Sequence, residues 1–195
     1  MTSRQTQGRA FVISSPSGGG KTTVVERLRC VMPRLIRSVS ATTRASRPGE
    51  RQGHDYRFVS PEAFQRLRRS GHLLEWAKVH SAFYGTLKRP VLRALAKGRD
   101  VVLSIDVQGA RKVRRALGRQ AVLIFLLPPS MNDLRCRLTR RRTDTPAAIR
   151  RRLAAAKREI ACASWYDYAI VNDRLPLAVA RVKAIIQGRR EQRKG

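Results

Sequence analysis

The sequence predicts an α/β fold in which five parallel strands form a sheet flanked by helices. The first observation is that five short segments read as strands, at residues 10–14, 37–43, 100–106, 121–127 and 168–172, and all but the second are largely apolar. The second is that helical stretches separate most of these runs, an alternation typical of parallel sheets. The third is that DVVLSID and AVLIFLL are continuous apolar runs, as expected for strands buried on both faces.

Helices are expected between the strands and after the last strand. In chain order they span residues 20–30, 108–117, 130–141, 146–164 and 175–187. Residues 44–86 break the alternation, because they hold the short strands YRFVS and LLEWAKV and a short helix, SPEAFQRLRRSG. Ser60 and Pro61 begin that helix and Gly71 ends it. The segment therefore predicts a small inserted lobe.

Length and composition exclude several classes of protein. With 195 residues and 42% hydrophobic content, the chain can bury one core and carry a small extra lobe. It holds no run near the roughly 18 apolar residues that a membrane span needs. No apolar segment of signal-peptide type follows the start MTSRQTQGR, so we expect a cytoplasmic protein without a membrane partner. The three cysteines lie far apart and predict neither disulfides nor a metal cluster.

The net charge of the chain is strongly positive. Lys and Arg total 42 and Asp and Glu total 13, which gives a formal net charge of +29. Such a charge attracts polyanions, including nucleotides and nucleic acids. Because the basic residues are spread along the whole chain, a solvated surface and an accessory nucleic-acid role both stay open. The oligomeric state is equally undecided.

The stretch SSPSGGGKTT, residues 14–23, predicts a phosphate-binding loop (P-loop), because it follows an apolar strand and precedes a helix. Ser15 replaces the first glycine of the usual pattern, but a small residue fits there. Backbone N–H groups of the loop and the helix N-terminus favour phosphate oxygens. Lys21 is expected to reach the β- and γ-phosphates of a nucleotide and Thr22 to coordinate Mg²⁺. The residues expected around the nucleotide are Ser17, Gly18, Gly19, Gly20, Lys21, Thr22 and Thr23.

A second anion site is predicted in the segment SATTRASRPGERQGHDYRFVS. Arg44, Arg47 and Tyr56 are expected to converge on a second phosphate. Pro48, Gly49 and Gly53 constrain this non-helical segment, which suits a fixed bidentate clamp.

At these positions the sequence resembles the guanylate kinase family. The family signature is Thr-Thr-Arg followed by Arg, Glu, Gly and Tyr-x-Phe at fixed spacing. The matching residues are Thr42, Thr43, Arg44, Arg47, Glu50, Gly53, Tyr56 and Phe58. The resemblance continues through LLEWAKVHSAFYGT, IDVQGARKV, FLLPPS and YAIVND and covers about residues 10–187.

The resemblance implies a P-loop NTPase-like core and Mg²⁺-dependent transfer of the γ-phosphoryl group of ATP to GMP, and to dGMP, in purine nucleotide metabolism. Glu75 would then accept hydrogen bonds from N1–H and the 2-amino group of guanine. Because adenine lacks both donors, a buried carboxylate would reject it by about 10⁴-fold or more. The other residues implied to bind GMP are Ser40 and Thr86 at the base and Arg44, Arg47, Tyr56 and Tyr84 at the phosphate.

On the ATP side, the resemblance implies a mobile helical lid. Arg137, Arg141 and Arg152 match its phosphate-binding arginines, and with Lys21 and Arg44 they would neutralise charge that develops during transfer. Asn172 matches a position near the adenine.

Asp106 follows an apolar strand, at a point where phosphotransferases of this kind hold Mg²⁺ or its waters. The family usually carries a second acid two residues earlier, but this chain has Ser104 there. That departure puts a further contact to magnesium, its waters or the GMP site in doubt.

The resemblance divides the chain into a P-loop core (1–43, 87–133 and 154–195), a GMP-binding lobe (44–86) and a lid (134–153). The alternative is a non-catalytic guanylate-kinase-like binding module, or nucleic-acid binding added through the basic surface. Such modules typically lose the P-loop and the lid arginines, whereas this chain keeps Lys21, Thr22 and Arg137.

Overall fold

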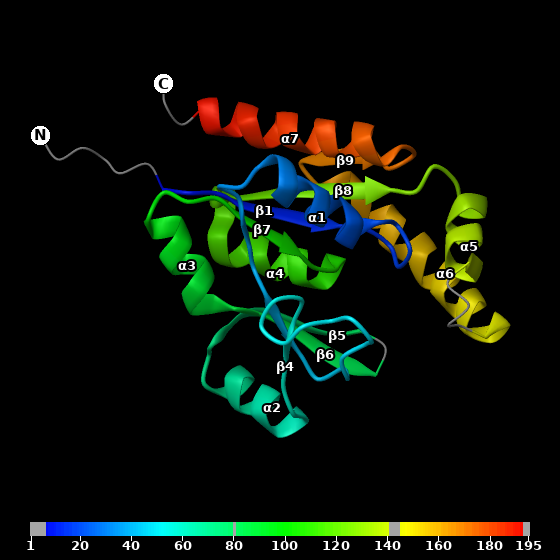
Figure 1. Cartoon of the computed structure of the whole chain (residues 1–195), viewed down its shortest axis with the longest axis horizontal. Coiled ribbons are helices and arrows are strands. Elements are labelled where there is room, and N and C mark those ends of the chain that lie inside the picture. Colours follow the sequence, from blue (N-terminus) through cyan, green and yellow to red (C-terminus); the bar gives the residue numbers. More distant parts are fainter. Residues whose placement is uncertain (1–6, 80, 141–144, 193–195) are drawn as a thin grey trace, which may run out of the picture.

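The structure, a computed structural model, describes residues 7–79, 81–140 and 145–192. Figure 1 shows a central sheet between two layers of helices, a smaller sheet beside it, and a pair of helices at one end. Among the described residues, no helix is both long enough and apolar enough to span a membrane.

The central sheet confirms the predicted parallel sheet. Its strands are β2 (Ile36–Arg37), β7 (Val101–Ser104), β1 (Ala10–Ser14), β8 (Ala121–Leu127) and β9 (Tyr168–Val171), in that spatial order. Every neighbouring pair is parallel. All carboxyl ends of the strands therefore lie at one edge of the sheet, where ligands of such folds bind.

Both faces of the central sheet are buried. Phe11 and Ile13 pack against α1 (Lys21–Val31) and α7 (Leu175–Glu191) on one face (Figure 1). The alternate residues Ala10 and Val12 pack on the other face, against a layer formed by the helices α3 (Lys88–Ala96) and α4 (Val107–Leu117). This alternation explains why the strands read as continuous apolar runs.

The inserted lobe is a mixed four-stranded sheet with one helix, α2 (Pro61–Arg69). Its strands, in spatial order, are β4 (Arg57–Phe58), β3 (Ser40–Thr42), β6 (Ala82–Leu87) and β5 (Leu73–Val79). The single strand expected at 37–43 was wrong, because the chain leaves the central sheet after Arg37 and joins the lobe sheet at Ser40. Residues 38 and 39 therefore connect the core to the lobe.

Two elements of the structure were not expected from the sequence. Strand β6 contains Tyr84-Gly85-Thr86, a combination that weakens the strand pattern. Helix α3 follows β6 directly, and its N-cap, Leu87, makes no side-chain capping bond. The usual start signal of a helix is therefore missing there.

The remaining helices are α5 (Met131–Arg140) and α6 (Pro146–Ala161), with short 3-10 helices at Gly118–Gln120 and Cys162–Trp165. Helices α5 and α6 extend from one end of the core (Figure 1). They share a small apolar cluster of Leu134, Leu138 and Ala156. The long helix expected at 146–164 is thus an α-helix that tightens into 3-10 geometry at its end.

Candidate active site

The P-loop connects the end of β1 to the start of α1. Gly20 is the N-cap of α1 with φ of 89°, a left-handed conformation that glycine adopts without strain. Within the described chain no side chain caps this helix, so its first-turn N–H groups are available to an anion. Thr22 and Thr23 are exposed on that turn, and Ser17, Gly18 and Gly19 form the loop before it.

Lys21 lies at the point where three acidic residues approach the P-loop. Its ammonium donates a hydrogen bond to the Ile105 carbonyl oxygen at 3.1 Å. Burial lowers the pKa of Lys21, and the carboxylates of Asp106, Glu159 and Glu75 act in the opposite direction. These acids come from the start of α4, from α6 and from β5, so Lys21 lies near residues of the core and of the lobe alike.

Glu159 was not identified from the sequence. Burial raises the pKa of its carboxyl group, while Lys21 lowers it and the Ser17 backbone N–H donates a hydrogen bond to it. The carboxylate therefore sits against the loop where a phosphate is expected, and an arriving phosphate would compete with it. Only the fold reveals this, because Glu159 belongs to no motif and lies 142 residues from Ser17 (159 − 17).

Asn172 supports the P-loop. It is 6% exposed, and its side-chain amide donates to the Gly19 carbonyl oxygen at 2.8 Å. A Cβ on Gly20 would meet that amide nitrogen at 2.4 Å, so a glycine is required beside it. Arg137 donates to the Asn172 carbonyl oxygen at 2.9 Å, which connects α5 to the same residue. Contact of Asn172 with adenine stays a prediction.

The three residues predicted to bind the base form one row across the lobe sheet. Ser40 pairs with Thr86 between β3 and β6, and Thr86 pairs with Glu75 between β6 and β5. The Thr86 hydroxyl donates to Glu75 Oε1 at 2.6 Å. A register shift between Leu73 and Glu75 sets this pairing. Without it, Leu74 would lie opposite Thr86.

Glu75 is a buried carboxyl group, 4% exposed. Its pKa is raised to about 7, chiefly by burial and also by Asp106, while the Thr86 hydrogen bond and Lys112 act in the opposite direction. A buried carboxylate is unfavourable when it is left unpaired, so donors from a ligand would stabilise its charged form. The N1–H and 2-amino groups of guanine supply two such donors.

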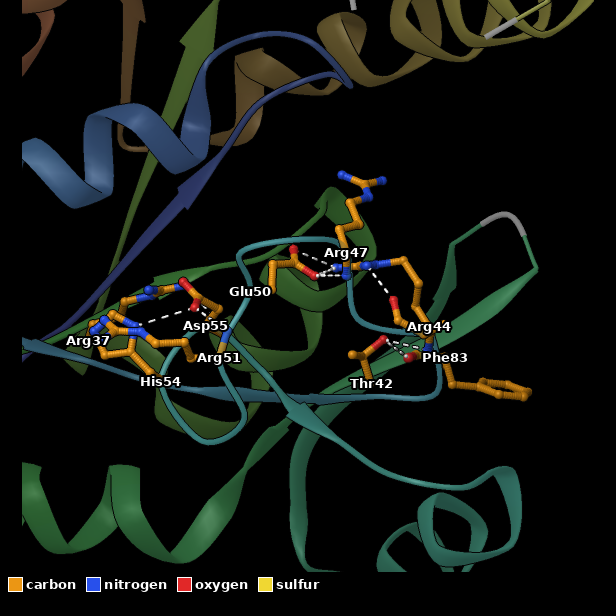
Figure 2. Close-up of polar contacts among 10 residues, drawn as sticks. Arg37, Thr42, Arg44, Arg47, Glu50, Arg51, His54, Asp55 and Phe83 are labelled. Carbon is orange, nitrogen blue, oxygen red and sulfur yellow. Dashed lines mark hydrogen bonds and ion pairs between the residues drawn. The ribbon is translucent and has the colours of Figure 1, made fainter. Parts of the chain in front are cut away.

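The predicted phosphate clamp is organised by Glu50. Arg44 donates to Glu50 Oε1 and Oε2 at 2.8 and 2.9 Å, and the Arg47 backbone N–H donates to Glu50 Oε2 at 2.8 Å. Figure 2 shows the Arg47 side chain extending away from the Glu50 carboxylate. The Arg47 guanidinium is thus oriented outward, while Arg44 is fixed by Glu50.

Two aromatic rings lie near the Arg44 guanidinium. Its carbon lies 5.4 Å from the centroid of the Tyr56 ring and 5.7 Å from that of Phe58. The Tyr56 and Tyr84 rings meet edge to face at 6.0 Å. Of the predicted phosphate ligands, Arg44, Tyr56 and Tyr84 are therefore brought together, and Arg47 lies beside them on the same loop.

A narrow cleft separates the core from the lobe. Its lining includes Thr22 of α1, Ser104 of β7, and Ser40 and Tyr56 of the lobe. Thr22 of the P-loop helix thus shares this small space with two of the predicted GMP residues, Ser40 and Tyr56.

Asp106 is the N-cap of α4, where Oδ1 accepts a hydrogen bond from the Gly109 N–H at 2.8 Å. The described residues contain no group of three or more His, Cys, Asp or Glu placed to hold a metal ion. Mg²⁺ commonly takes one or two protein oxygens and completes its shell with phosphates and water. Thr22 and Asp106 fit such a partial ligand set.

The predicted lid arginines lie on two helices that pack together. Arg137 belongs to α5 and Arg152 to α6. The third, Arg141, lies outside the described residues.

A further polar network joins the P-loop helix to the lobe and was not identified from the sequence. Arg37 of β2 donates to Glu26 Oε1 of α1 at 2.6 Å and to the Asp55 carbonyl oxygen at 3.0 Å. Figure 2 shows Arg37 beside Asp55 and the loop that carries it. Because the three residues belong to three different segments, no spacing in the sequence indicates the network.

A P-loop core beside a second lobe that carries clustered arginines and tyrosines is typical of a nucleoside monophosphate kinase. A family model described as guanylate kinase matches residues 7–189. The guanylate kinase of Mycolicibacterium paratuberculosis is 49% identical over 183 residues, which cover 93% of this chain and 82% of that relative. The guanylate kinase of Dechloromonas aromatica is 47% identical over 180 residues, or 92% and 89% of the two chains. The chain belongs to the guanylate kinase family.

Solved structures agree with this assignment. The crystal structure of guanylate kinase from Anaplasma phagocytophilum superposes with a TM-score of 0.79 at 36% identity and covers 94% of this chain and 87% of that one. The SH3-kinase fragment of tight junction protein 3 superposes with a TM-score of 0.50 at 14% identity, covering 96% and 58%. The second likeness concerns the fold alone.

Proposed function

We propose that this chain is an ATP-dependent guanylate kinase that transfers the γ-phosphoryl group of ATP to GMP, and to dGMP, with Mg²⁺. The observation that carries the proposal is the row of Ser40, Thr86 and the buried Glu75. It places hydroxyl groups and a carboxylate side by side in the lobe that shares a cleft with the P-loop. Guanine offers the complementary donors and acceptor, and adenine does not.

On the acceptor side, Arg44, Arg47, Tyr56 and Tyr84 would bind the GMP phosphate. Glu50 holds Arg44 by two hydrogen bonds, so the guanidinium is positioned before the substrate arrives. Such preorganisation reduces the entropy lost on binding. Arg47 would supply a second positive charge from the same loop.

On the donor side, Lys21 and the first N–H groups of α1 would bind the β- and γ-phosphates of ATP. We propose that Ser17, Gly18, Gly19, Gly20, Thr22 and Thr23 surround the same phosphates. Arg137, Arg141 and Arg152 of the lid would reach them when the lid closes. The GMP phosphate is ionised at neutral pH and needs no side-chain base, so these cations act by positioning and by neutralising charge.

We propose Thr22 and Asp106 as the residues that hold Mg²⁺ or its waters. The ion would bridge phosphate oxygens and offset their charge. Ser104 lines the cleft with Thr22, so its hydroxyl can contact a water there but adds no charge. We propose that turnover tolerates this departure from the family.

We further propose that the lobe, whose sheet begins at Ser40, and the lid (134–153) close over the core during each cycle. Closure would bring the two phosphates in line and exclude water, which could otherwise accept the phosphoryl group. A kinase of ATP and GMP acts where these nucleotides are made, which supports a cytoplasmic role in purine nucleotide metabolism.

A coupled assay for ADP release tests the proposal. We expect turnover with GMP and at least about 10⁴-fold lower kcat/KM with AMP. Lys21→Ala should lower kcat with GMP by about 10²-fold or more without unfolding the protein, because it removes charge from the transferred phosphate. Absence of turnover with GMP from folded protein would contradict the proposal and favour a binding module. Near-normal activity of Lys21→Ala would contradict the P-loop assignment.

A further inference from the structure

Gly109 lies where the first turn of α4 meets the predicted guanine site. It follows the N-cap Asp106 by three residues and is buried. A Cβ built on Gly109 would lie 2.6 Å from Glu75 Oε2 and 3.1 Å from Glu75 Cδ. Both distances are shorter than van der Waals contact. The space in which the Glu75 carboxylate sits therefore exists because residue 109 has no side chain.

The helix cannot easily move away to make room. One turn after Gly109, Lys112 donates a hydrogen bond to the carbonyl oxygen of Trp76, the residue that follows Glu75. The Lys112 ammonium also lies 4.2 Å from the centroid of the Trp76 ring. Lys112 thus holds α4 against β5 close to the contact between Gly109 and Glu75. A methyl group at position 109 would therefore displace the Glu75 carboxylate rather than the helix.

The carboxylate cannot move without losing its present partner. Glu75 Oε1 accepts the Thr86 hydroxyl hydrogen bond at 2.6 Å, while Oε2 faces Gly109. The hydrogen bond and an added methyl group cannot both be kept in the present geometry. The carboxyl end of a glutamate is flexible, however, so the protein can fold with the carboxylate displaced.

We propose that Gly109 is a specificity-determining position, because its missing side chain sets the place from which Glu75 reads the guanine edge. Gly109 acts through Glu75 and is a positioning residue. The inference rests on the proposed function and adds a determinant that belongs to neither the P-loop nor the Glu75 strand.

The test is Gly109→Ala, measured by direct GMP binding and by steady-state kinetics with GMP, IMP and AMP. Position 109 has ordinary helical backbone geometry, and alanine is a better helix former than glycine, so folding should be retained. We expect the Kd and KM for GMP to rise at least about tenfold, as for a lost charged hydrogen bond. ATP binding should change less than about twofold. The preference for GMP over IMP, which lacks the 2-amino group, should shrink.

Two further variants make the test decisive. Gly188→Ala is the matched control, because it also replaces a helical glycine but a Cβ there meets no atom within 4 Å; it should leave GMP binding unchanged. Glu75→Asp shortens the side chain by one methylene and, as a single substitution, should weaken GMP binding. In the double variant with Gly109→Ala, the Kd for GMP should rise by less than the product of the two single fold-changes, because the two residues share one space.

Each outcome bears on a different claim. Unchanged GMP binding in Gly109→Ala, or strictly multiplicative effects in the double variant, would overturn the role of Gly109. Equal losses of ATP and GMP binding would also overturn it, since they would indicate general damage near Asp106. If the unmodified protein neither binds nor phosphorylates GMP, the proposed function fails instead, whatever the Gly109 variant does.

Discussion

Glu75 illustrates a conflict between stability and function at the scale of one residue. Its carboxyl group is buried and accepts a short hydrogen bond from the Thr86 hydroxyl, and burial is the main cause that raises its pKa to about 7. The folded protein therefore holds that proton more tightly than the unfolded chain. By linkage, this contribution to stability is complete below the unfolded pKa and is lost as the pH rises through about 7.

We expect Glu75→Gln to stabilise the ligand-free protein at pH 8 and to abolish GMP recognition. Glutamine keeps the acceptor for Thr86 but carries no charge. The free energy of unfolding should rise by up to about 3 kcal/mol at pH 8 and by much less near pH 5. Denaturant titrations of both proteins at the two pH values measure this. An equal gain at both pH values would show that the charge of Glu75 is not the cause.

The residues of the site differ in how far the sequence could predict them. The P-loop lies in consecutive residues, so Lys21 and Thr22 could be placed from local pattern alone. Glu75 was identified by resemblance, and its role as a guanine-reading residue stays a prediction. Gly109 and Glu159 contact residues that are distant in the sequence. Glutamate is common in helices, and a glycine inside a helix does not indicate which side chain lies against it. No local pattern separates them from structural residues.

At the scale of elements, the link made by Arg37 is the feature with the clearest consequence. The Arg37 side chain is 10% exposed and joins Glu26 of α1 to the carbonyl oxygen of Asp55. Tyr56, a predicted phosphate ligand, follows Asp55 directly. The loop that presents Tyr56 is therefore fastened to the helix that begins with Lys21, which fixes one substrate site relative to the other.

We expect Arg37→Met to weaken GMP binding more than ATP binding. Methionine retains much of the apolar packing but leaves the Asp55 carbonyl oxygen without this partner. The KM for GMP should rise several-fold, with a loss of about 1–3 kcal/mol in the free energy of unfolding. Steady-state kinetics and denaturant titration measure the two effects.

Arg29→Met is the matched control for this experiment. Arg29 also pairs with Glu26, at 3.2 Å, but its side chain is 37% exposed and the pair lies within α1. Its loss should change stability by less than about 1 kcal/mol and leave the KM for GMP unchanged. If Arg37→Met and Arg29→Met changed the KM for GMP equally, the effect would come from the loss of the Glu26 ion pair. The hydrogen bond from Arg37 to the Asp55 loop would then have no role in GMP binding.

Helices and strands were predicted well where the apolar pattern is strong. They were predicted poorly where the structure depends on which residues pair across neighbouring strands. Four of the five core strands were expected within a few residues, because continuous apolar runs are distinctive, whereas the strand expected at 37–43 was wrong. The row that joins Ser40, Thr86 and Glu75 depends on the irregular pairing after Leu73. A shift of one residue would turn Glu75 to the other face of the sheet. Such a shift arises from tertiary packing and has no signature in the sequence.

At the scale of the whole molecule, the net charge of +29 exceeds what the two substrate sites use. Arg44, Arg47 and Lys21 belong to the proposed phosphate sites, but most basic residues belong to other parts of the chain. Their field raises the local concentration of any anion, nucleotides included. The excess charge is either only solvated or also binds nucleic acid, and the two cases differ in how binding responds to salt.

We expect short RNA duplexes to bind weakly at low salt and to be released as the salt concentration rises. Each neutralised phosphate releases counterions, so affinity should fall by about 10³-fold or more between about 50 and 200 mM salt if six or more phosphates are contacted. Fluorescence anisotropy across a salt series measures this. GMP kinetics with and without RNA would show whether the bound polyanion covers the substrate cleft. Undetectable binding at low salt, or binding that does not respond to salt, would mean that the excess charge is only a solvated surface.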